Sequence, residues 1–372
     1  MQHPIGLTWG ILATGRIAES ECSSFSLTTP FSPHNPNPIG RRILHLSSYC
    51  LCLFGQSHAP ESVTPYDSYS ALLSSSCEAI YVATPHSHHY QNAMMALEAR
   101  KHILIEKPIA VNQEQARTIF ETAAKKQLFV MERLWTRFQP VGNAFRQVLG
   151  DVGPVRRIWA DNGLGMDVES QFPESDRMVL LNLAGGSLLD WGIYSLNWVL
   201  QALGQRGDYT SCSAASVMMK YACTGVDESK TILLKFLSEE KHEIQAIIAS
   251  SLRCATDADG NIPCLRVQGD NGETQVFGWP WRPSKLRIIA RQQGFGNQGT
   301  VVKEILNIIP NSIYGLVYEA DEMARCIYKG KLESETMSWK ECLATMGIMD
   351  QVRKENGLWF GDEAESVTYP LV

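Results

Sequence analysis

The stretch AIYVATPHSHHYQNAMMALEARKHILIEKP, residues 79–108, decides the fold of the N-terminal part of the chain. Its first five residues are an apolar run typical of a buried strand, and the apolar positions of residues 90–100 recur at helical spacing. Residues 102–105 form a second apolar run of strand length. A strand, a helix and a strand in this order predict a parallel sheet with helices on both faces.

The segments on both sides extend this alternation. Residues 7–12 predict another buried strand with a tight turn at 13–18, and residues 41–54 contain the apolar run of a second strand. Four prolines, at 30, 33, 36 and 38, prevent a continuous helix between these two strands. Further elements are predicted at residues 69–74 (short helix), 113–126 (helix) and 128–131 (strand), and a helix at 141–148 follows this domain. We therefore predict an α/β domain over residues 1–133 that is irregular at 19–65.

The pattern changes after residue 155, where strand-like segments follow one another with few helices between them. These segments are residues 157–162, 213–219, 231–236, 243–250, 265–269 and 273–277. They predict a large, open and mostly antiparallel sheet. Helices predicted at 318–329 and 339–355 close a second, α+β domain over residues 134–372.

Composition narrows the function. The 372 residues carry a formal net charge of −6, which argues against a nucleic-acid or anionic-membrane partner and favours a small-molecule substrate. No apolar run reaches the roughly 20 residues that span a bilayer, and no secretory leader is recognisable, so the expected location is the cytosol. The ten cysteines lack C-x-x-C spacing and are expected to be buried free thiols.

Ligands of open parallel sheets bind beyond the carboxyl ends of the strands, so the residues that follow each strand are the candidate site. Residues 13–18 follow the first strand, and their backbone N–H groups suit a pyrophosphate, although a plain tight turn is equally compatible with them. Thr84, Pro85 and His86 follow a later strand together with His88 and His89. Adjacent histidines at a turn converge poorly on one ion, so we expect imidazoles lining a pocket rather than a metal site.

Two further groups are candidates for proton transfer. Glu106, Lys107 and Pro108 follow a buried strand, where an ammonium is either salt-bridged scaffolding or a catalytic group. Asp190 and Tyr194 are four residues apart at the start of an apolar helix and therefore on one face of it. A nearby ammonium such as Lys107 would favour the phenolate form of Tyr194. The alternative is a structural role, in which the Tyr194 hydroxyl only satisfies a buried hydrogen bond.

Four motifs together resemble the Gfo/Idh/MocA oxidoreductase family, and in particular its dihydrodiol dehydrogenase and NADP-dependent D-xylose 1-dehydrogenase branch. They are G-I-L-A-T-G-R-I-A at 10–18, Y-V-A-T-P-H-S-H-H at 81–89, E-K-P at 106–108 and G-G-S-L-L-D-W-G-I-Y at 185–194. The resemblance implies an N-terminal Rossmann fold that binds NADP or NAD, and a homodimer formed through the C-terminal sheet. It also implies transfer of a hydride from a sugar or from a cyclic trans-diol to nicotinamide.

The resemblance assigns roles to individual residues. Tyr194 is the expected acid/base, Lys107 its catalytic neighbour, and Asp190 a further catalytic and substrate-binding carboxylate. Trp135 and Arg137 are expected to bind substrate as well. The expected cofactor contacts are Gly10, Ala13, Thr14, Gly15, Arg16, Ile17, Thr84, Pro85, His86, His89, Glu106 and Lys107.

One segment departs from the family pattern. Residues 51–58, L-C-L-F-G-Q-S-H, offer neither the arginine that NADP-using relatives place after the second strand nor an acid that would hold the ribose of NAD. Two alternatives to the dehydrogenase therefore stay open. One is a redox-silent cyclase, isomerase or lyase with the same proton-handling residues, and the other is a cofactor-deficient protein.

Overall fold

The computed structural model describes residues 6–12, 40–47, 64–204, 209–238, 242–292, 299–308, 315 and 317–371. The chain divides into two compact units. Unit 1 comprises Met1–Trp135, Asn311–Leu343 and Asp362–Val372, and unit 2 comprises Thr136–Pro310 and Ala344–Gly361. The predicted boundary at residues 133 and 134 lies close to the first of these divisions. The residues after 310 alternate between the two units, so a single boundary in the sequence does not separate them.

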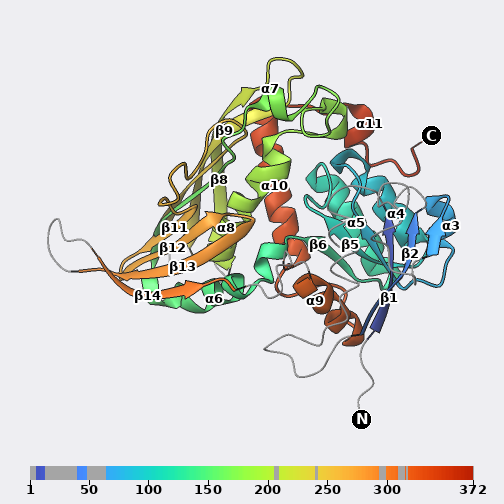
Figure 1. Ribbon diagram of the computed structural model, residues 1–372, viewed down its shortest axis with the longest axis horizontal. Coiled ribbons are helices and arrows are strands. Elements are labelled where there is room, and N and C mark those ends of the chain that lie inside the picture. The colour runs from blue at the N-terminus through green and yellow to red at the C-terminus, as the bar shows by residue number, and fades with distance from the viewer. Residues whose placement is uncertain are drawn as a thin grey trace, which may run out of the picture. The chain divides into compact units, whose positions relative to one another are not determined.

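Unit 1 is built on a six-stranded parallel sheet with the strand order β3-β2-β1-β4-β5-β6 (Figure 1). Its strands are β1 (Gly6–Leu12), β2 (Gly40–Ser47), β3 (Thr64–Tyr66), β4 (Ala79–Val82), β5 (His102–Glu106) and β6 (Val130–Arg133). The order reverses between β1 and β4, which is the topology of a dinucleotide-binding fold. The predicted Rossmann-type sheet is confirmed, and only the three-residue strand β3 escaped prediction.

Two helices of unit 1, α3 (Tyr69–Leu73) and α5 (Gln113–Lys126), begin at residues whose side chains cap them. The unit also contains α4 (His89–Glu98), α9 (Val317–Tyr328) and α11 (Asp362–Glu365). The side chain of Asn112 caps α5 by accepting a hydrogen bond from the backbone N–H of Gln115, and the helix ends at Gln127 in the left-handed conformation. Every residue of β4 is buried, as expected for a central strand covered on both faces.

The last residues of the chain pack onto helices α4 and α5 of unit 1. The buried amide of Gln115 donates to the carbonyl oxygens of Ala364 and Ser366, each at 2.8 Å. The hydroxyl of Tyr90 donates to the carbonyl of Val367 at 2.6 Å. The C-terminal segment is therefore an integral part of the N-terminal fold.

Unit 2 contains an eight-stranded sheet with the order β14-β13-β12-β11-β7-β10-β9-β8 (Figure 1). The strands are β7 (Val155–Gly163), β8 (Tyr209–Lys220), β9 (Asp227–Ser238), β10 (Glu243–Ser251), β11 (Leu265–Gly269), β12 (Gly272–Trp279), β13 (Arg282–Ala290) and β14 (Thr300–Leu306). All neighbours are antiparallel except β10 and β7. The predicted mostly antiparallel sheet is confirmed, and β13 and β14 are additional strands.

Helix α8 (Ile193–Gly204) packs against one face of this sheet, chiefly against β7 and β10. Trp198 of α8 forms an edge-to-face pair with Phe145 of α6 (Pro140–Val148), with ring centroids 5.0 Å apart. The Trp198 ring nitrogen donates to the carbonyl of Pro280 at 2.8 Å, which satisfies the one polar atom of a fully buried side chain. Unit 2 also contains α7 (Val168–Gln171) and most of α10 (Trp339–Glu355).

Candidate functional site

The carboxyl ends of three neighbouring strands in unit 1 lie side by side. In the register of the parallel sheet, Val82 of β4 pairs with Leu12 of β1 and with Ile105 of β5. The turns that follow these strands therefore start at the same edge, where open α/β sheets bind their ligands. Gly10 lies inside β1, where a Cβ would come within 2.8 Å of Ile80. The predicted contacts of Ala13, Thr14, Gly15, Arg16 and Ile17 lie outside the described residues.

The buried ring of His89 contacts both the turn after β4 and the turn after β5. Its Nε2 lies 2.8 Å from the carbonyl oxygen of Thr84, and its Nδ1 lies 2.7 Å from the carbonyl oxygen of Pro108. Burial lowers the pKa of this histidine, although both carbonyl contacts act against the shift. His89 thus ties the turn after β4 to the turn after β5. Of the predicted contacts nearby, Thr84 and His86 are buried and Pro85 is half-buried.

Glu106, the last residue of β5, is anchored inside the unit. Its carboxylate forms an ion pair with the buried guanidinium of Arg133 and accepts a hydrogen bond of 2.5 Å from the hydroxyl of Tyr81. Arg133 also pairs with Glu319 of α9. Although burial acts to raise the pKa of Glu106, the charges of Arg133 and Lys107 lower it below its ordinary value.

Lys107 follows this anchored carboxylate and is half-buried, and its peptide bond to Pro108 is cis. Its neighbour Glu106 carries the ion pair with Arg133. The residues on both sides of Lys107 are fixed, Glu106 by Arg133 and Pro108 by His89. The ammonium group is therefore presented from a well-defined backbone at the strand edge.

In unit 2, Asp190 and Tyr194 lie on a continuous helical segment that starts as a π-helical turn. The turn, η5, spans Leu188–Gly192, and α8 continues it from Ile193. Both side chains are buried. The carboxylate of Asp190 accepts a hydrogen bond of 2.9 Å from the half-exposed Arg177, which also forms an ion pair with it. Single π-helical turns inside helices are found frequently at functional sites.

The two predicted substrate contacts upstream, Trp135 and Arg137, are both buried. Arg137 belongs to unit 2, where its Nε lies 2.5 Å from the side-chain oxygen of Asn197 on α8. Its carbonyl oxygen accepts a hydrogen bond of 2.8 Å from Arg146. Arg137 therefore braces the helix that carries Tyr194.

A buried ion pair beneath η5 was not found from the sequence. Lys230 and Asp227 of β9 are both fully buried, with the ammonium nitrogen 2.6 Å from a carboxylate oxygen. A signal exists in the sequence, because strand alternation places Lys230 on the same face as Ile232 and Leu234, which are core residues. Arg177 was missed as well, and it lies in a segment with no regular periodicity.

Among the described residues, no group of three or more histidines, cysteines or acids could hold a metal ion. The cysteines of the described residues are free thiols, but the expectation that they are buried is wrong for Cys212, Cys223 and Cys254, which are exposed. None of the helices in the described parts combines the length with the apolar composition that crossing a bilayer requires.

The strand order of unit 1 defines a dinucleotide-binding fold joined to a second unit with a large open sheet. The profile of an oxidoreductase family with an NAD-binding Rossmann fold matches residues 55–134. The D-xylose 1-dehydrogenase (NADP(+)) of Hypocrea jecorina is 36% identical over 99% of this chain and 94% of its own length. The human trans-1,2-dihydrobenzene-1,2-diol dehydrogenase is 30% identical over 96% of this chain and 98% of its own. The chain belongs to the Gfo/Idh/MocA oxidoreductase family, as the sequence predicted.

Solved structures agree on the fold. A levoglucosan dehydrogenase in complex with NADH and levoglucosan superposes with a TM-score of 0.77 at 14% identity, over 95% of this chain and 97% of the other. A 3-ketoreductase from Actinomadura kijaniata, in complex with NADP and TDP-benzene, gives 0.73 at 18% identity over 95% and 98%. The protein is accordingly an NAD(P)-dependent oxidoreductase whose curated relatives include sugar and dihydrodiol dehydrogenases.

Proposed function

We propose that this chain is an NADP-dependent dehydrogenase that oxidises a hydroxyl-bearing carbon of an aldopyranose such as D-xylose, or of a cyclic trans-dihydrodiol. The observation that carries the proposal is the 36% identity to an NADP-dependent D-xylose 1-dehydrogenase along 99% of the chain. Its free thiols suit the cytosol, which is the location we propose.

The described part of the strand edge in unit 1 fits a dinucleotide. The order of the sheet reverses between β1 and β4, which is where such folds hold the cofactor. We assign the nicotinamide half to the turns that contain Thr84, Pro85, His86 and Lys107, and the pyrophosphate to residues 13–17. When bound, the nicotinamide ring accepts a hydride from the substrate carbon.

The residues of the chain handle the proton. The hydroxyl of the substrate loses its proton to the phenolate oxygen of Tyr194 as its carbon loses a hydride, so that a carbonyl group forms. An aldopyranose becomes a lactone in this step. Lys107 favours the phenolate by its positive charge, and Asp190, fixed by Arg177, accepts a hydrogen bond from a second hydroxyl of the substrate. Trp135 forms a wall of the sugar pocket.

The test combines binding with turnover. Isothermal titration calorimetry measures the affinity for NADP+ and NAD+, and absorbance at 340 nm measures the oxidation of D-xylose by the wild type and by Tyr194→Phe. The matched control is Tyr221→Phe, which removes the hydroxyl of another buried tyrosine of unit 2. We expect binding of NADP+, a loss of about 100-fold or more in kcat for Tyr194→Phe, and little change for the control.

Either of two results would contradict the proposal. A folded protein that binds neither nucleotide is not a dehydrogenase and fits a redox-silent or cofactor-deficient role instead. A Tyr194→Phe variant with the kcat of the wild type would remove Tyr194 from the chemistry, even if the protein oxidises the sugar.

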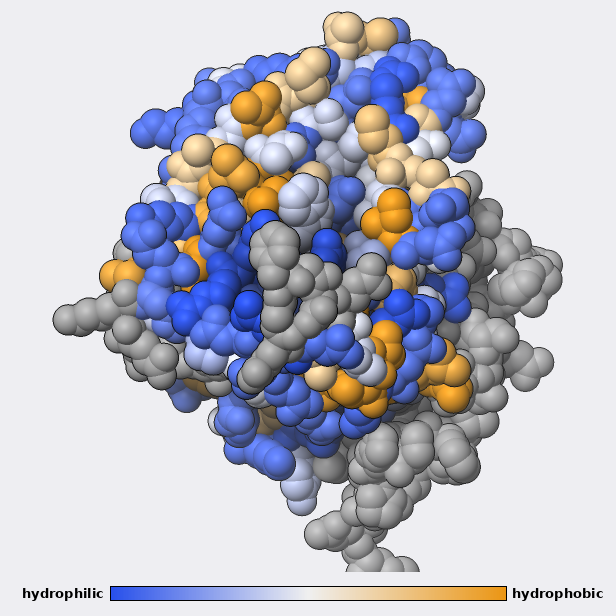
Figure 2. All heavy atoms as spheres, turned by 90° about the vertical axis from the view of Figure 1, so that its left-hand side faces the viewer, coloured by the Kyte–Doolittle hydropathy of each residue, from blue (hydrophilic) through white to orange (hydrophobic). Residues whose placement is uncertain are grey.

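We also propose that a second copy of the chain covers the outer face of the unit 2 sheet. Large apolar side chains stand exposed on this face, including Trp159, Val217, Met219 and Leu233. The sheet register places Trp159, Ile247 and Leu233 in one row across β7, β10 and β9. Figure 2, which views the molecule from the side where Figure 1 draws these strands, shows apolar patches between hydrophilic side chains.

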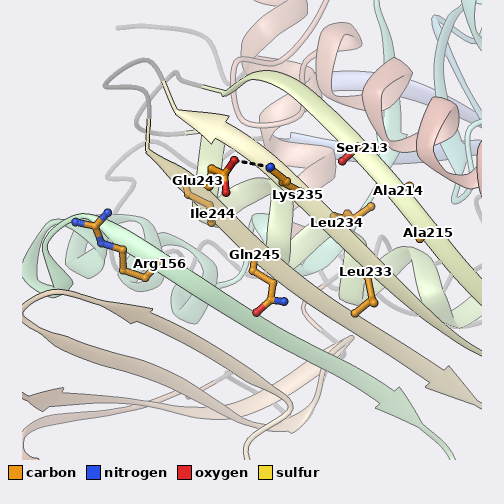
Figure 3. A pocket seen from close by; sticks show the side chains of 10 residues that line it. All are labelled: Arg156, Ser213, Ala214, Ala215, Leu233, Leu234, Lys235, Glu243, Ile244 and Gln245. Carbon is orange, nitrogen blue, oxygen red and sulfur yellow. Dashed lines mark ion pairs between the residues drawn. The ribbon is translucent and has the colours of Figure 1, made fainter.

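Two ion pairs lie on this face. Lys235 and Glu243 form an ion pair at the hollow drawn in Figure 3, and Arg266 pairs with Glu273 farther along the sheet. Such a face needs no oppositely charged partner, and its exposed apolar row suits a two-fold symmetric contact with itself. Sedimentation velocity tests the proposal. Leu233→Glu should convert dimer to monomer, whereas Ile262→Glu, at a similarly exposed aliphatic residue in a loop, should not. A monomeric wild type would refute it.

A further inference from the structure

The turn that carries Asp190 rests on the buried pair of Asp227 and Lys230. One oxygen of the Asp227 carboxylate, Oδ2, accepts hydrogen bonds from the Lys230 ammonium and from the backbone N–H of Leu188, each at 2.6 Å. Leu188 is the first residue of η5. A strand residue of the sheet therefore fixes the start of the segment on which Asp190 and Tyr194 lie.

Two glycines near this turn lie where the backbone closely approaches the side chains of Asp227 and Lys230. Gly186 has a φ of +115°, and a Cβ there would lie 2.2 Å from the other carboxylate oxygen of Asp227. At Gly192, a Cβ would lie 3.4 Å from Cε of Lys230 and 3.1 Å from the hydroxyl of Ser250. The two glycines bracket Asp190 in the sequence. Two glycines of the motif G-G-S-L-L-D-W-G are thus explained by the close packing of the turn against Asp227 and Lys230.

A third glycine, Gly185, packs closely against the backbone of Arg177, the ion-pair partner of Asp190. A Cβ at Gly185 would lie 2.4 Å from the carbonyl oxygen of Arg177, and the N–H of Gly186 donates to the carbonyl of Met178 at 2.7 Å. The loop that supplies the Arg177 guanidinium is therefore fastened to the backbone that Asp227 holds. Asp190 and the loop of its ion-pair partner are thus both connected to the backbone that Asp227 contacts.

Stability alone does not account for such a pair. Both charges are fully buried, and the cost of removing two charges from water can equal or exceed their mutual attraction. Well-packed apolar residues of the same volume are often at least as stabilising in such positions. Burial lowers the pKa of Lys230 to about 8 and raises the pKa of Asp227, as expected where burial disfavours both charged forms. What the pair adds is direction, because an apolar side chain could accept a hydrogen bond neither from the Lys230 ammonium nor from the Leu188 N–H.

We propose that Asp227 and Lys230 are positioning residues that hold the turn Leu188–Gly192 in place and thereby set the placement of Asp190 and Tyr194 for proton transfer. The consequence for proton transfer rests on the function proposed above. Neither residue touches substrate in this scheme. Their effect is transmitted through the backbone of the turn.

The test replaces the pair by apolar residues of similar size, in the variant Asp227→Leu/Lys230→Met. Asp227→Asn is the conservative second variant, because its amide oxygen can still accept a hydrogen bond from Leu188 if the double variant fails to fold. The control is Arg353→Met, which removes a buried cation that pairs with Asp350 of its own helix. Thermal unfolding ranks the stability of all three.

The first readout is independent of activity. Amide hydrogen exchange, followed by mass spectrometry, should be about 10-fold faster in residues 186–196 of the double variant, with strand β10 unchanged. Asp227→Asn should fall between the wild type and the double variant, and Arg353→Met should leave this segment as in the wild type. Unchanged exchange in residues 186–196 of a folded double variant, or of Asp227→Asn if the double variant does not fold, would overturn the proposal.

The second readout is the division between kcat and KM. Misplacement of a proton acceptor by about 1 Å costs on the order of 100-fold in rate, so kcat for D-xylose should fall by that order in the double variant. The proposed NADP+ site lies on unit 1, so the dissociation constant of the double variant for NADP+ should stay within about three-fold of the wild-type value. A double variant with faster exchange but the kcat of the wild type overturns the positioning role. An inactive wild type sinks the proposed function, and the exchange data then still decide whether the pair holds the turn.

Discussion

The substitution Gly186→Ala probes the contact between the turn and the buried pair most directly. The new Cβ would lie 2.2 Å from Oδ1 of Asp227, 3.1 Å from its Cγ and 3.2 Å from its backbone nitrogen. The carboxylate cannot swing aside freely, because its other oxygen bonds both Leu188 and Lys230. We expect the carboxylate to shift and to lose one of these two hydrogen bonds.

The magnitude follows from two terms. A left-handed backbone conformation costs a residue with a Cβ roughly 1–2 kcal/mol relative to glycine. Loss of one hydrogen bond to a buried charge adds about 1.5–3 kcal/mol. Gly186→Ala should therefore lower the free energy of unfolding of unit 2 by about 2.5–5 kcal/mol. Gly225 isolates the first term, because it has a φ of +82° and no atom within 4 Å of the position that a Cβ would occupy. Gly225→Ala should accordingly cost about 1–2 kcal/mol.

The assay is urea unfolding followed by circular dichroism, carried out as a double-mutant cycle with Asp227→Ala. In the Asp227→Ala background the obstructing carboxylate is absent, and Gly186→Ala should cost only the backbone term. The coupling between the two substitutions should reach about 1.5–3 kcal/mol. The reasoning is refuted if Gly186→Ala costs the same with and without the Asp227 carboxylate.

Three further predictions concern buried groups of both units. Arg133→Met should destabilise unit 1 by about 3–5 kcal/mol because it leaves the carboxylate of Glu106 buried without its cation. Since the pKa of Glu106 is lowered in the fold, its contribution is complete above its ordinary pKa and is lost as the pH falls, so acid titration of stability should be flatter in Arg133→Met. The pKa of Lys230 is lowered to about 8 in the fold, so the unfolded chain binds the proton more tightly. The free energy of unfolding should therefore rise as the pH increases from about 8 toward the ordinary lysine pKa. This rise should be absent in Lys230→Met. Phe145→Ala removes a fully buried ring that packs on Trp198 and should cost about 3–5 kcal/mol in thermal unfolding.

Much of the fold could be predicted from the sequence because periodicity is strongest in buried strands and amphipathic helices. Helix α5 and helix α10 were predicted to the residue, since each has an unbroken helical pattern between clear end signals. Strand β14 was missed because nearly all of its residues are exposed, so that it lacks the alternation that marks a half-buried strand. Strand β3 is too short to leave any pattern.

The candidate site was only partly readable for a different reason. Lys107 and Asp190 stand out in the sequence because charged residues directly follow apolar runs there. Arg133 and Glu319, which anchor the residue before Lys107, are far apart in the sequence and meet only in the folded unit. The role of Asp227 depends in the same way on a tertiary contact, with the backbone of Leu188. Pair contacts between distant segments carry no local periodicity, and one sequence alone does not reveal them.

The packing of residues 362–371 onto unit 1 has a consequence for the order in which the protein matures. The side-chain amide nitrogen of the buried Gln115, close to the start of α5, donates to the carbonyl oxygens of Ala364 and Ser366. During synthesis, N-terminal domains commonly fold as units while the rest of the chain is still being made. Here the first domain to leave the ribosome forms part of its native contacts with residues that are synthesised after all of unit 2. The Rossmann unit is therefore begun early in translation and completed only when unit 2 already exists in full.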